Sequence, residues 1–159
     1  MNKKTKKMTH AAIIAALYVV LTYCAHMLGL SSGAIQVRIS EALTVLPYFT
    51  PAAIPGLFVG CITANLLTGS TILDIVFGSV ATLLGALGTY ALRKRSMYLA
   101  PVAPIIANSL IIPFVLVYAG VPGSWWYFAL TVGAGELISC GLFGIILIKA
   151  LKKKSSSIF

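Results

Sequence analysis

Residues 36–67 read QVRISEALTVLPYFTPAAIPGLFVGCITANLL, and this stretch decides how the chain folds. It places the charged residues Arg38 and Glu41 inside an otherwise apolar run. It also contains three prolines, at positions 47, 51 and 55. Each proline removes a backbone hydrogen-bond donor and fixes φ, which favours a turn between two helices. The stretch therefore predicts two short helices, and the way they cross a membrane determines the rest of the topology.

The composition of the chain is that of a membrane protein. Of its 159 residues, 59% are hydrophobic and 9% are charged, whereas about 25% are charged in soluble globular domains. The mean hydropathy is +0.99. The apolar runs are long enough to cross a hydrocarbon core of about 30 Å, which takes roughly 20 helical residues. We therefore expect an all-α integral membrane protein that lies in a lipid bilayer.

The net charge of +9 comes from three short basic clusters, at residues 3–7, 93–95 and 149–154. Clusters that flank apolar spans mark the cytoplasmic side, and the chain has no extended basic surface of the kind that binds nucleic acid. If residues 39–67 formed one span, the second and third clusters would lie opposite the N-terminus. Two spans place all three clusters on one side. The positive-inside rule therefore predicts six spans, with the N- and C-termini cytoplasmic.

The predicted fold is a single transmembrane domain, residues 1–159, built as a six-transmembrane-helix bundle. The approximate helices are 9–28, 38–49, 53–67, 72–92, 99–118 and 127–149. The second and third are shorter than a usual span, so their unpaired backbone groups must face protein or a water-filled cavity. That requirement makes the two short helices candidate walls of a binding site.

Polar residues at membrane depth are candidates for function, because each ionisable group there costs a few kcal/mol. The chain has only three acids, and the predicted topology places all of them at mid-depth or in the outer half, together with one arginine and two asparagines. An aromatic group lies at the expected outer interface. The candidate substrate-binding residues are Arg38, Glu41, Asn65, Asp74, Asn108, Trp125 and Glu136.

Each charged candidate also has a structural interpretation. Arg38 and Glu41 are three residues apart, so they share a helix face and suit an ion pair. Arg38 alternatively snorkels to the outer headgroups. Glu41 and Glu136 suit hydrogen bonds between helices as well as contact with a ligand. Asp74, in the first turn of its helix, suits a cap on free N–H groups.

The uncharged candidates leave the same choice open. Asn65 and Asn108 suit either hydrogen bonds between helices or contact with a ligand. Trp125 has interface anchoring as its default role. On the first helix, small residues at four-residue spacing permit close approach of another helix, either within the chain or on a partner protein. These residues are Ala11, Ala12, Ala15 and Ala16.

Motifs of enzymes do not occur in the sequence. It has no GxSxG nucleophile motif, no HExxH metal motif and no Walker sequence. We therefore expect no catalytic residue, metal site or cofactor, and no hydrolysis of ATP by the chain itself. A polar pocket in a helical bundle without catalytic chemistry indicates a membrane subunit that binds a solute.

Three segments resemble the QueT family, the substrate-binding S components of energy-coupling-factor (ECF) transporters that take up queuosine precursors. They are QVRISEALTVLPYFTPAAIPGLFVGCITANLLTG (36–69), DIVFGSVATLLGALGTYALRKR (74–95) and LAPVAPIIAN (99–108). The resemblance extends over all six predicted helices and is most specific from Gln36 to Tyr90. At Ala103 the family tends to have a second proline, a departure that affects only the start of the fifth helix.

The resemblance implies an ECF S-component fold in the plasma membrane of a prokaryote. It implies a 7-deazaguanine substrate, such as preQ0, preQ1 or queuine, captured from the outside. It further implies two kinds of partner, a transmembrane scaffold subunit and two cytoplasmic ATPases that drive reorientation. In such families an alanine-rich stripe on the first helix docks on the scaffold, and here that stripe corresponds to the four alanines named above.

A guanine-like base fits the candidate residues. Adjacent N–H donors on one edge of the base suit a carboxylate, either Glu136 or Glu41. Asn65 and Asn108 suit the remaining carbonyl and ring nitrogens, and Trp125 suits stacking on the ring. A precursor that bears an aminomethyl group is cationic and favours a second acid.

Three other functions fit the same sequence. The first is an S component for another vitamin or base, since the pocket suits any compact polar aromatic. The second is a gradient-driven transporter that uses the buried acids as a proton relay. The third is a structural membrane protein that binds nothing.

Overall fold

The stretch that begins near Arg38 forms two short helices separated by a proline-rich turn, as predicted. The computed structural model describes residues 2–29 and 38–153, so Gln36 and Lys154 lie outside the described residues. The first short helix, η1, is a 3-10 helix over Ile39–Tyr48, and the second, α2, is an α-helix over Ala53–Leu67.

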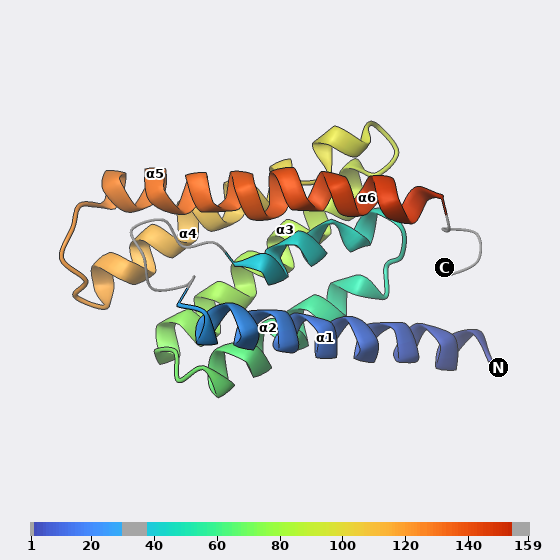
Figure 1. Ribbon diagram of the computed structural model, residues 1–159, viewed down its shortest axis with the longest axis horizontal. Helices are drawn as coiled ribbons and strands as arrows, with labels where there is room; N and C mark the ends of the chain where they lie inside the picture. Colours follow the sequence, from blue (N-terminus) through green and yellow to red (C-terminus); the bar gives the residue numbers. More distant parts are fainter. Residues whose placement is uncertain (1, 30–37, 154–159) are drawn as a thin grey trace.

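Over the described residues the chain runs back and forth in six helical segments (Figure 1). Besides η1 and α2 these are α1 (Lys3–Met27), η2 with α3 (Asp74–Gly78, Ser79–Leu92), η3 with α4 (Met97–Leu99, Val102–Tyr118), and the run of α5, η4 and α6 (Trp125–Glu136, Leu137–Phe143, Gly144–Lys152). Four of the six are long and apolar enough to cross a membrane, and η1 and α2 are shorter. The fold is therefore all-helical and suited to a multi-pass membrane protein, while a crossing by η1 and α2 stays a prediction.

The 3-10 form of η1 lengthens a short segment. A 3-10 helix rises about 2.0 Å per residue and an α-helix about 1.5 Å, so ten residues cover about 20 Å instead of about 15 Å. Eight of the ten residues, from Ser40 to Pro47, are buried. Because η1 contacts α1, α2, α3, η4 and α6, it runs through the centre of the bundle.

Two predicted helix starts are wrong by a few residues. α1 begins at Lys3 and not near residue 9, because lysine is a good helix former and the Asn2 side chain accepts a hydrogen bond from the Lys4 N–H. α5 begins at Trp125 and not at residue 127, because the Ser124 hydroxyl caps its first turn. The π-helical segments η2 and η4 were not predicted either.

The proline turn and the basic clusters lie at one end of the bundle. The ammonium nitrogen of Lys152 lies 5.7 Å from the ring centroid of Tyr48, which precedes the turn, and 3.8 Å from the sulfur of Met97, which follows the second cluster. Lys7 lines a groove together with Pro51 of the turn. Figure 1 shows the start of α1 and the end of α6 on this side. This shared end is the arrangement on which the six-span prediction rests.

Close packing of α1 on α2 fixes the rotation of α1. A Cβ built on Gly56 would lie 2.6 Å from the carbonyl oxygen of Ala11, and one built on Gly60 would lie 3.0 Å from the Cα of Ala15. Only glycine allows backbones to approach this closely. The contact turns the face of α1 that includes Tyr18 toward η1 and α2.

Candidate functional site

Four buried polar side chains meet between four helical segments. Tyr18 comes from α1, Glu41 from η1, Asn108 from α4 and Glu136 from the last residue of α5. Their exposed fractions are 2%, 1%, 4% and 6%. Burial at this depth is costly for a carboxylate unless hydrogen-bond donors replace water. Of the seven candidate residues, the structure brings Glu41, Asn108 and Glu136 into direct hydrogen-bonding contact, while their contact with a substrate stays a prediction.

One amide joins the two carboxylates. The Asn108 Nδ2 donates to Glu41 Oε2 at 3.4 Å and to Glu136 Oε1 at 3.1 Å, which uses both of its N–H bonds. The Tyr18 hydroxyl donates to Glu41 Oε1. Both oxygens of Glu41 are therefore occupied. The second oxygen of Glu136, Oε2, is buried and accepts no hydrogen bond from the described residues.

A small polar cavity lies beside this cluster. Its volume is about 10 Å³, and its lining residues are Arg38, Asn108, Ile112, Val132 and Glu136. That volume holds about one water molecule. Arg38, immediately before η1, is close enough to Glu41 and Glu136 for Coulombic attraction. The ion pair with Glu41, one of the interpretations of Arg38, is not formed among the described residues; the Glu41 oxygens accept from Tyr18 and Asn108.

The chemistry available here is hydrogen bonding and charge. A buried carboxylate oxygen accepts N–H donors, a guanidinium donates to a carbonyl or ring nitrogen, and two acids attract a cation. Within residues 2–29 and 38–153, no group of three or more His, Cys, Asp or Glu side chains is placed to hold a metal ion.

Asn65 and Asp74 lie apart from the cavity. The Asn65 Nδ2 donates to the backbone carbonyl of Asp74 at 3.1 Å, which ties the end of α2 to the start of the next helix. The Asp74 carboxylate accepts from the Thr71 hydroxyl at 2.9 Å, and that hydroxyl in turn accepts from the Asp74 N–H at 3.2 Å. The Thr71 hydroxyl thus caps the first turn of this helix, and the Asp74 carboxylate holds that hydroxyl in place. Asn65 therefore makes the hydrogen bond between helices that was one of its two interpretations, whereas Asp74 supports the capping residue instead of accepting from a backbone N–H itself.

Trp125 is likewise absent from the lining of the polar cavity. It is half-buried at the start of α5, where its ring lies 5.4 Å from Phe114 and 4.7 Å from the exposed Trp126. Its indole Nε1 is buried without a partner among the described residues. An aromatic group at a helix end suits the interface role.

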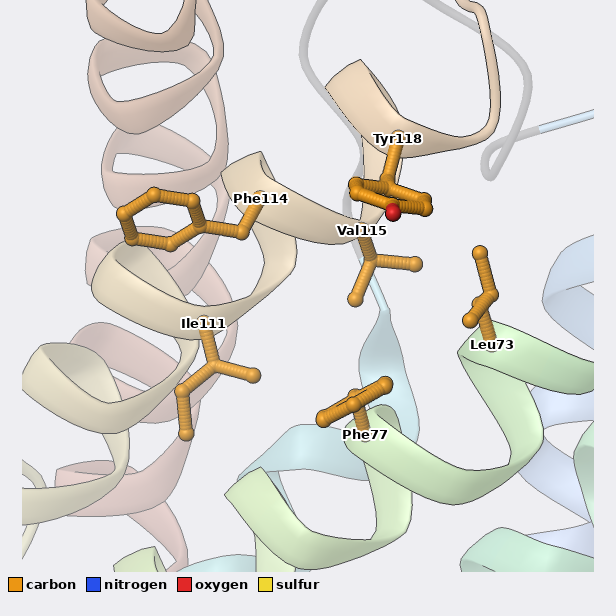
Figure 2. A pocket seen from close by; sticks show the side chains of 6 residues that line it. All are labelled: Leu73, Phe77, Ile111, Phe114, Val115 and Tyr118. Atoms are coloured by element: carbon orange, nitrogen blue, oxygen red, sulfur yellow. The ribbon is translucent and has the colours of Figure 1, made fainter.

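A larger groove on the bundle carries no charged group. It has a volume of about 540 Å³ and lies between the start of η2 and α4, where Leu73 and Phe77 face Val115 and Tyr118 (Figure 2). Its other lining residues, Ile111 and Phe114, are apolar. Hydrogen-bond donors of a polar base would find few partners here, so we do not place the site in this groove.

The alanine stripe of α1 divides into two faces. Ala11 and Ala15 contact the glycines of α2, whereas Ala12 and Ala16 are exposed. Close packing within the chain therefore accounts for the first pair. The second pair is left free for another helix.

Tyr18 is the site residue that the sequence reading missed. It continues the buried face of α1 from Ala11, Ile14 and Ala15. A phenol on that stripe at mid-span was the available signal, because a buried Tyr hydroxyl usually finds a hydrogen-bond partner.

Comparisons with known proteins point to one family. The sequence model described as QueT transporter matches residues 8–153. A relative from Lactococcus lactis subsp. cremoris (strain MG1363), described as "Queuosine precursor transporter QueT", is 37% identical over 82 residues. The match covers 52% of this chain and 48% of the relative, so the chain spans about half the length of the curated relative that it matches. No solved structure matches the chain.

Proposed function

Because the chain belongs to the QueT transporter family, we propose that it is the substrate-binding membrane subunit of an ECF-type importer for queuosine precursors. The family name indicates a transporter and not an enzyme. Four apolar helices of spanning length support a multi-pass membrane protein. We place it in the plasma membrane of a prokaryote, with the basic end of the bundle in the cytoplasm.

The observation that carries the proposal is the free oxygen of Glu136. A buried acceptor without a donor is costly, and Glu136 Oε2 is such an acceptor beside a cavity that Arg38 and Asn108 also line. A 7-deazaguanine presents adjacent N–H donors on one edge and a carbonyl on another. In this proposal Glu136 accepts from the N–H edge, and Arg38 donates to the carbonyl.

Binding of a bicyclic base requires the cavity to widen, since about 10 Å³ admits only a molecule the size of water. The last helical run contains a segment next to the site where its geometry can change. The π-helical segment η4 begins at Leu137, directly after Glu136. Such segments are frequent at functional sites and at helix kinks. We infer that η4 shifts Glu136 when the base enters.

The proposed scaffold subunit docks on the exposed face of α1. Ala12 and Ala16 lie on that face at the spacing that suits helix contact. A groove of about 470 Å³, lined in part by Met8 and Pro55, adjoins the start of α1 at the basic end. Because α1 also contributes Tyr18 to the site, a movement of α1 would displace Glu41 through the hydrogen bond that Tyr18 donates to it.

Three measurements test this function. The purified chain should bind 7-deazaguanine bases, and a ligand that copurifies from cells should be one of them by mass spectrometry. Liposomes that contain the chain alone should not accumulate the base, whereas addition of a scaffold subunit, two ATPases and ATP should produce uptake. Failure of the purified chain to bind any of these bases would overturn the proposal.

The pair of buried carboxylates favours one alternative, a gradient-driven transporter in which Glu41 and Glu136 relay protons. The two mechanisms differ in the energy source. Accumulation of the base by liposomes that contain only this chain, in response to a pH gradient, would favour the relay.

A further inference from the structure

The polar cluster at the cavity contains two acidic side chains and one basic side chain. Two of the three acids of the chain, Glu41 and Glu136, are joined there by the Asn108 amide. Of the residues that line the cavity in the described part of the chain, Arg38 alone is cationic. With all three groups ionised, the formal charge of the cluster is −1.

The neighbouring donors do not remove this excess. Tyr18 and Asn108 stabilise the carboxylates by hydrogen bonds, but both side chains are neutral. Lysines lie near the proline turn at the basic end, as the contact of Lys152 with Tyr48 shows. In a medium of low dielectric constant, an uncompensated charge attracts a counter-charge strongly.

The two acids are not equivalent toward a ligand. Both oxygens of Glu41 already accept hydrogen bonds, from Tyr18 and Asn108. Glu136 has Oε2 free and borders the cavity. Glu136 is therefore the acid placed to contact a ligand, and Glu41 lies behind it as a second carboxyl group.

We propose that this site selects bases that carry a positive charge in addition to the guanine-like N–H edge. Within the substrate class of the proposed function, on which this inference rests, amine-bearing 7-deazaguanines such as the 7-aminomethyl base are preferred to the neutral 7-cyano base. The base edge satisfies Glu136, and the ammonium group balances the field of Glu41 and Glu136 together. The free amine, not the ring, sets the preference.

The test measures the ratio of two affinities. Isothermal titration of the purified chain with the 7-aminomethyl and the 7-cyano base, at one pH and ionic strength, should give at least about tenfold tighter binding of the cationic base, equivalent to about 1.4 kcal/mol. Glu41→Gln removes one negative charge and should move the ratio toward one. Arg38→Gln removes the positive charge and should increase the ratio. Each variant has its own expected change in the ratio, so either one tests the proposal if the other fails to fold.

Asp74→Asn is the matched control. It removes the same charge from the hydrogen-bonded pair of Thr71 and Asp74 outside the cavity, where an amide oxygen still accepts from Thr71, so the ratio should keep its wild-type value. Equal affinity of the wild-type chain for both bases, or shifts of the same sign in Glu41→Gln and Arg38→Gln, would overturn the charge selection alone. Absence of binding by either base would overturn the proposed function with it.

Discussion

At the scale of single residues, the site depends on how buried acids are satisfied. Glu41 is 1% exposed and has a donor on each oxygen, whereas Glu136 has one oxygen without a donor. The first arrangement satisfies the carboxylate within the fold, and the second leaves an oxygen that we propose accepts from a ligand. The same residue type thus has two roles, which the hydrogen bonds of its neighbours determine.

Tyr18→Phe tests the stabilising half of this arrangement. Loss of the hydroxyl leaves Glu41 Oε1 buried without its donor, which costs about 1–3 kcal/mol. We expect a lower thermal unfolding temperature in detergent and weaker binding of the base.

The matched control for this change is Tyr23→Phe. Tyr23 lies on the same helix but is 47% exposed, and surface substitutions usually change stability by less than about 0.5 kcal/mol. If Tyr18→Phe unfolded at the same temperature as Tyr23→Phe, the hydrogen bond to Glu41 would contribute nothing measurable.

The residues also show how far a sequence can locate such a site. The topology placed Glu41, Asn65, Asp74 and Asn108 at compatible depths, because the number of residues from a helix end gives the level in the bilayer. Depth does not give rotation about the helix axis. Rotation directs Asn108 into the cavity and directs Asn65 toward the carbonyl of Asp74.

At the scale of elements, α1 presents two faces with different uses. The face with Ala11 packs on Gly56 of α2, and the opposite one exposes Ala12 and Ala16. Four-residue spacing in the sequence could not separate these faces, because both alanine pairs have it. The contact with the glycines of α2 separates them.

The exposed face predicts a docking phenotype. Substitution of both Ala12 and Ala16 by Leu adds bulk where the proposed scaffold helix approaches, so the isolated chain should bind the base normally but fail to copurify with the scaffold subunit. Ala91→Leu, at an exposed position on α3, is the control and should leave assembly intact.

A substitution on the buried side, where α1 packs on α2, should instead affect the stability of the isolated chain. Gly56→Ala places a methyl group 2.6 Å from the Ala11 carbonyl oxygen and should lower the stability of the isolated chain by about 1–3 kcal/mol, as overpacking does. Normal assembly of the variant in which both Ala12 and Ala16 are Leu would refute docking through the exposed face of α1.

The element that the sequence described least well is η1. Its residues from Ser40 to Pro47 are buried all round. A segment that is surrounded by protein has no side facing solvent, so its apolar and polar residues do not alternate with a helical period. Without that period the sequence does not indicate the type of helix. The sequence predicted its position and shortness, and the 3-10 geometry follows from the span that it has to cover inside the bundle.

At the scale of the whole molecule, the six segments place the basic clusters at one end and the acids away from it. Lys152 contacts Tyr48 beside the proline turn, while Glu41 lies at the other end of η1. The basic clusters predicted helical segments that return to one end, because charge is costly to move across a bilayer; six crossings of a membrane stay a prediction. Within the described residues the bundle surrounds the buried polar cluster of Tyr18, Glu41, Asn108 and Glu136, on which the proposed recognition of the ligand depends.

Equilibrium binding of a 7-deazaguanine base to Glu136→Gln tests the proposed contact between Glu136 and the ligand. Gln keeps an acceptor oxygen for the Asn108 amide but replaces the free carboxylate oxygen with an amide donor. We predict at least about tenfold weaker binding than in the wild-type chain, about 1.4 kcal/mol, with the fold retained. Equal affinity of the folded variant and the wild-type chain would contradict it.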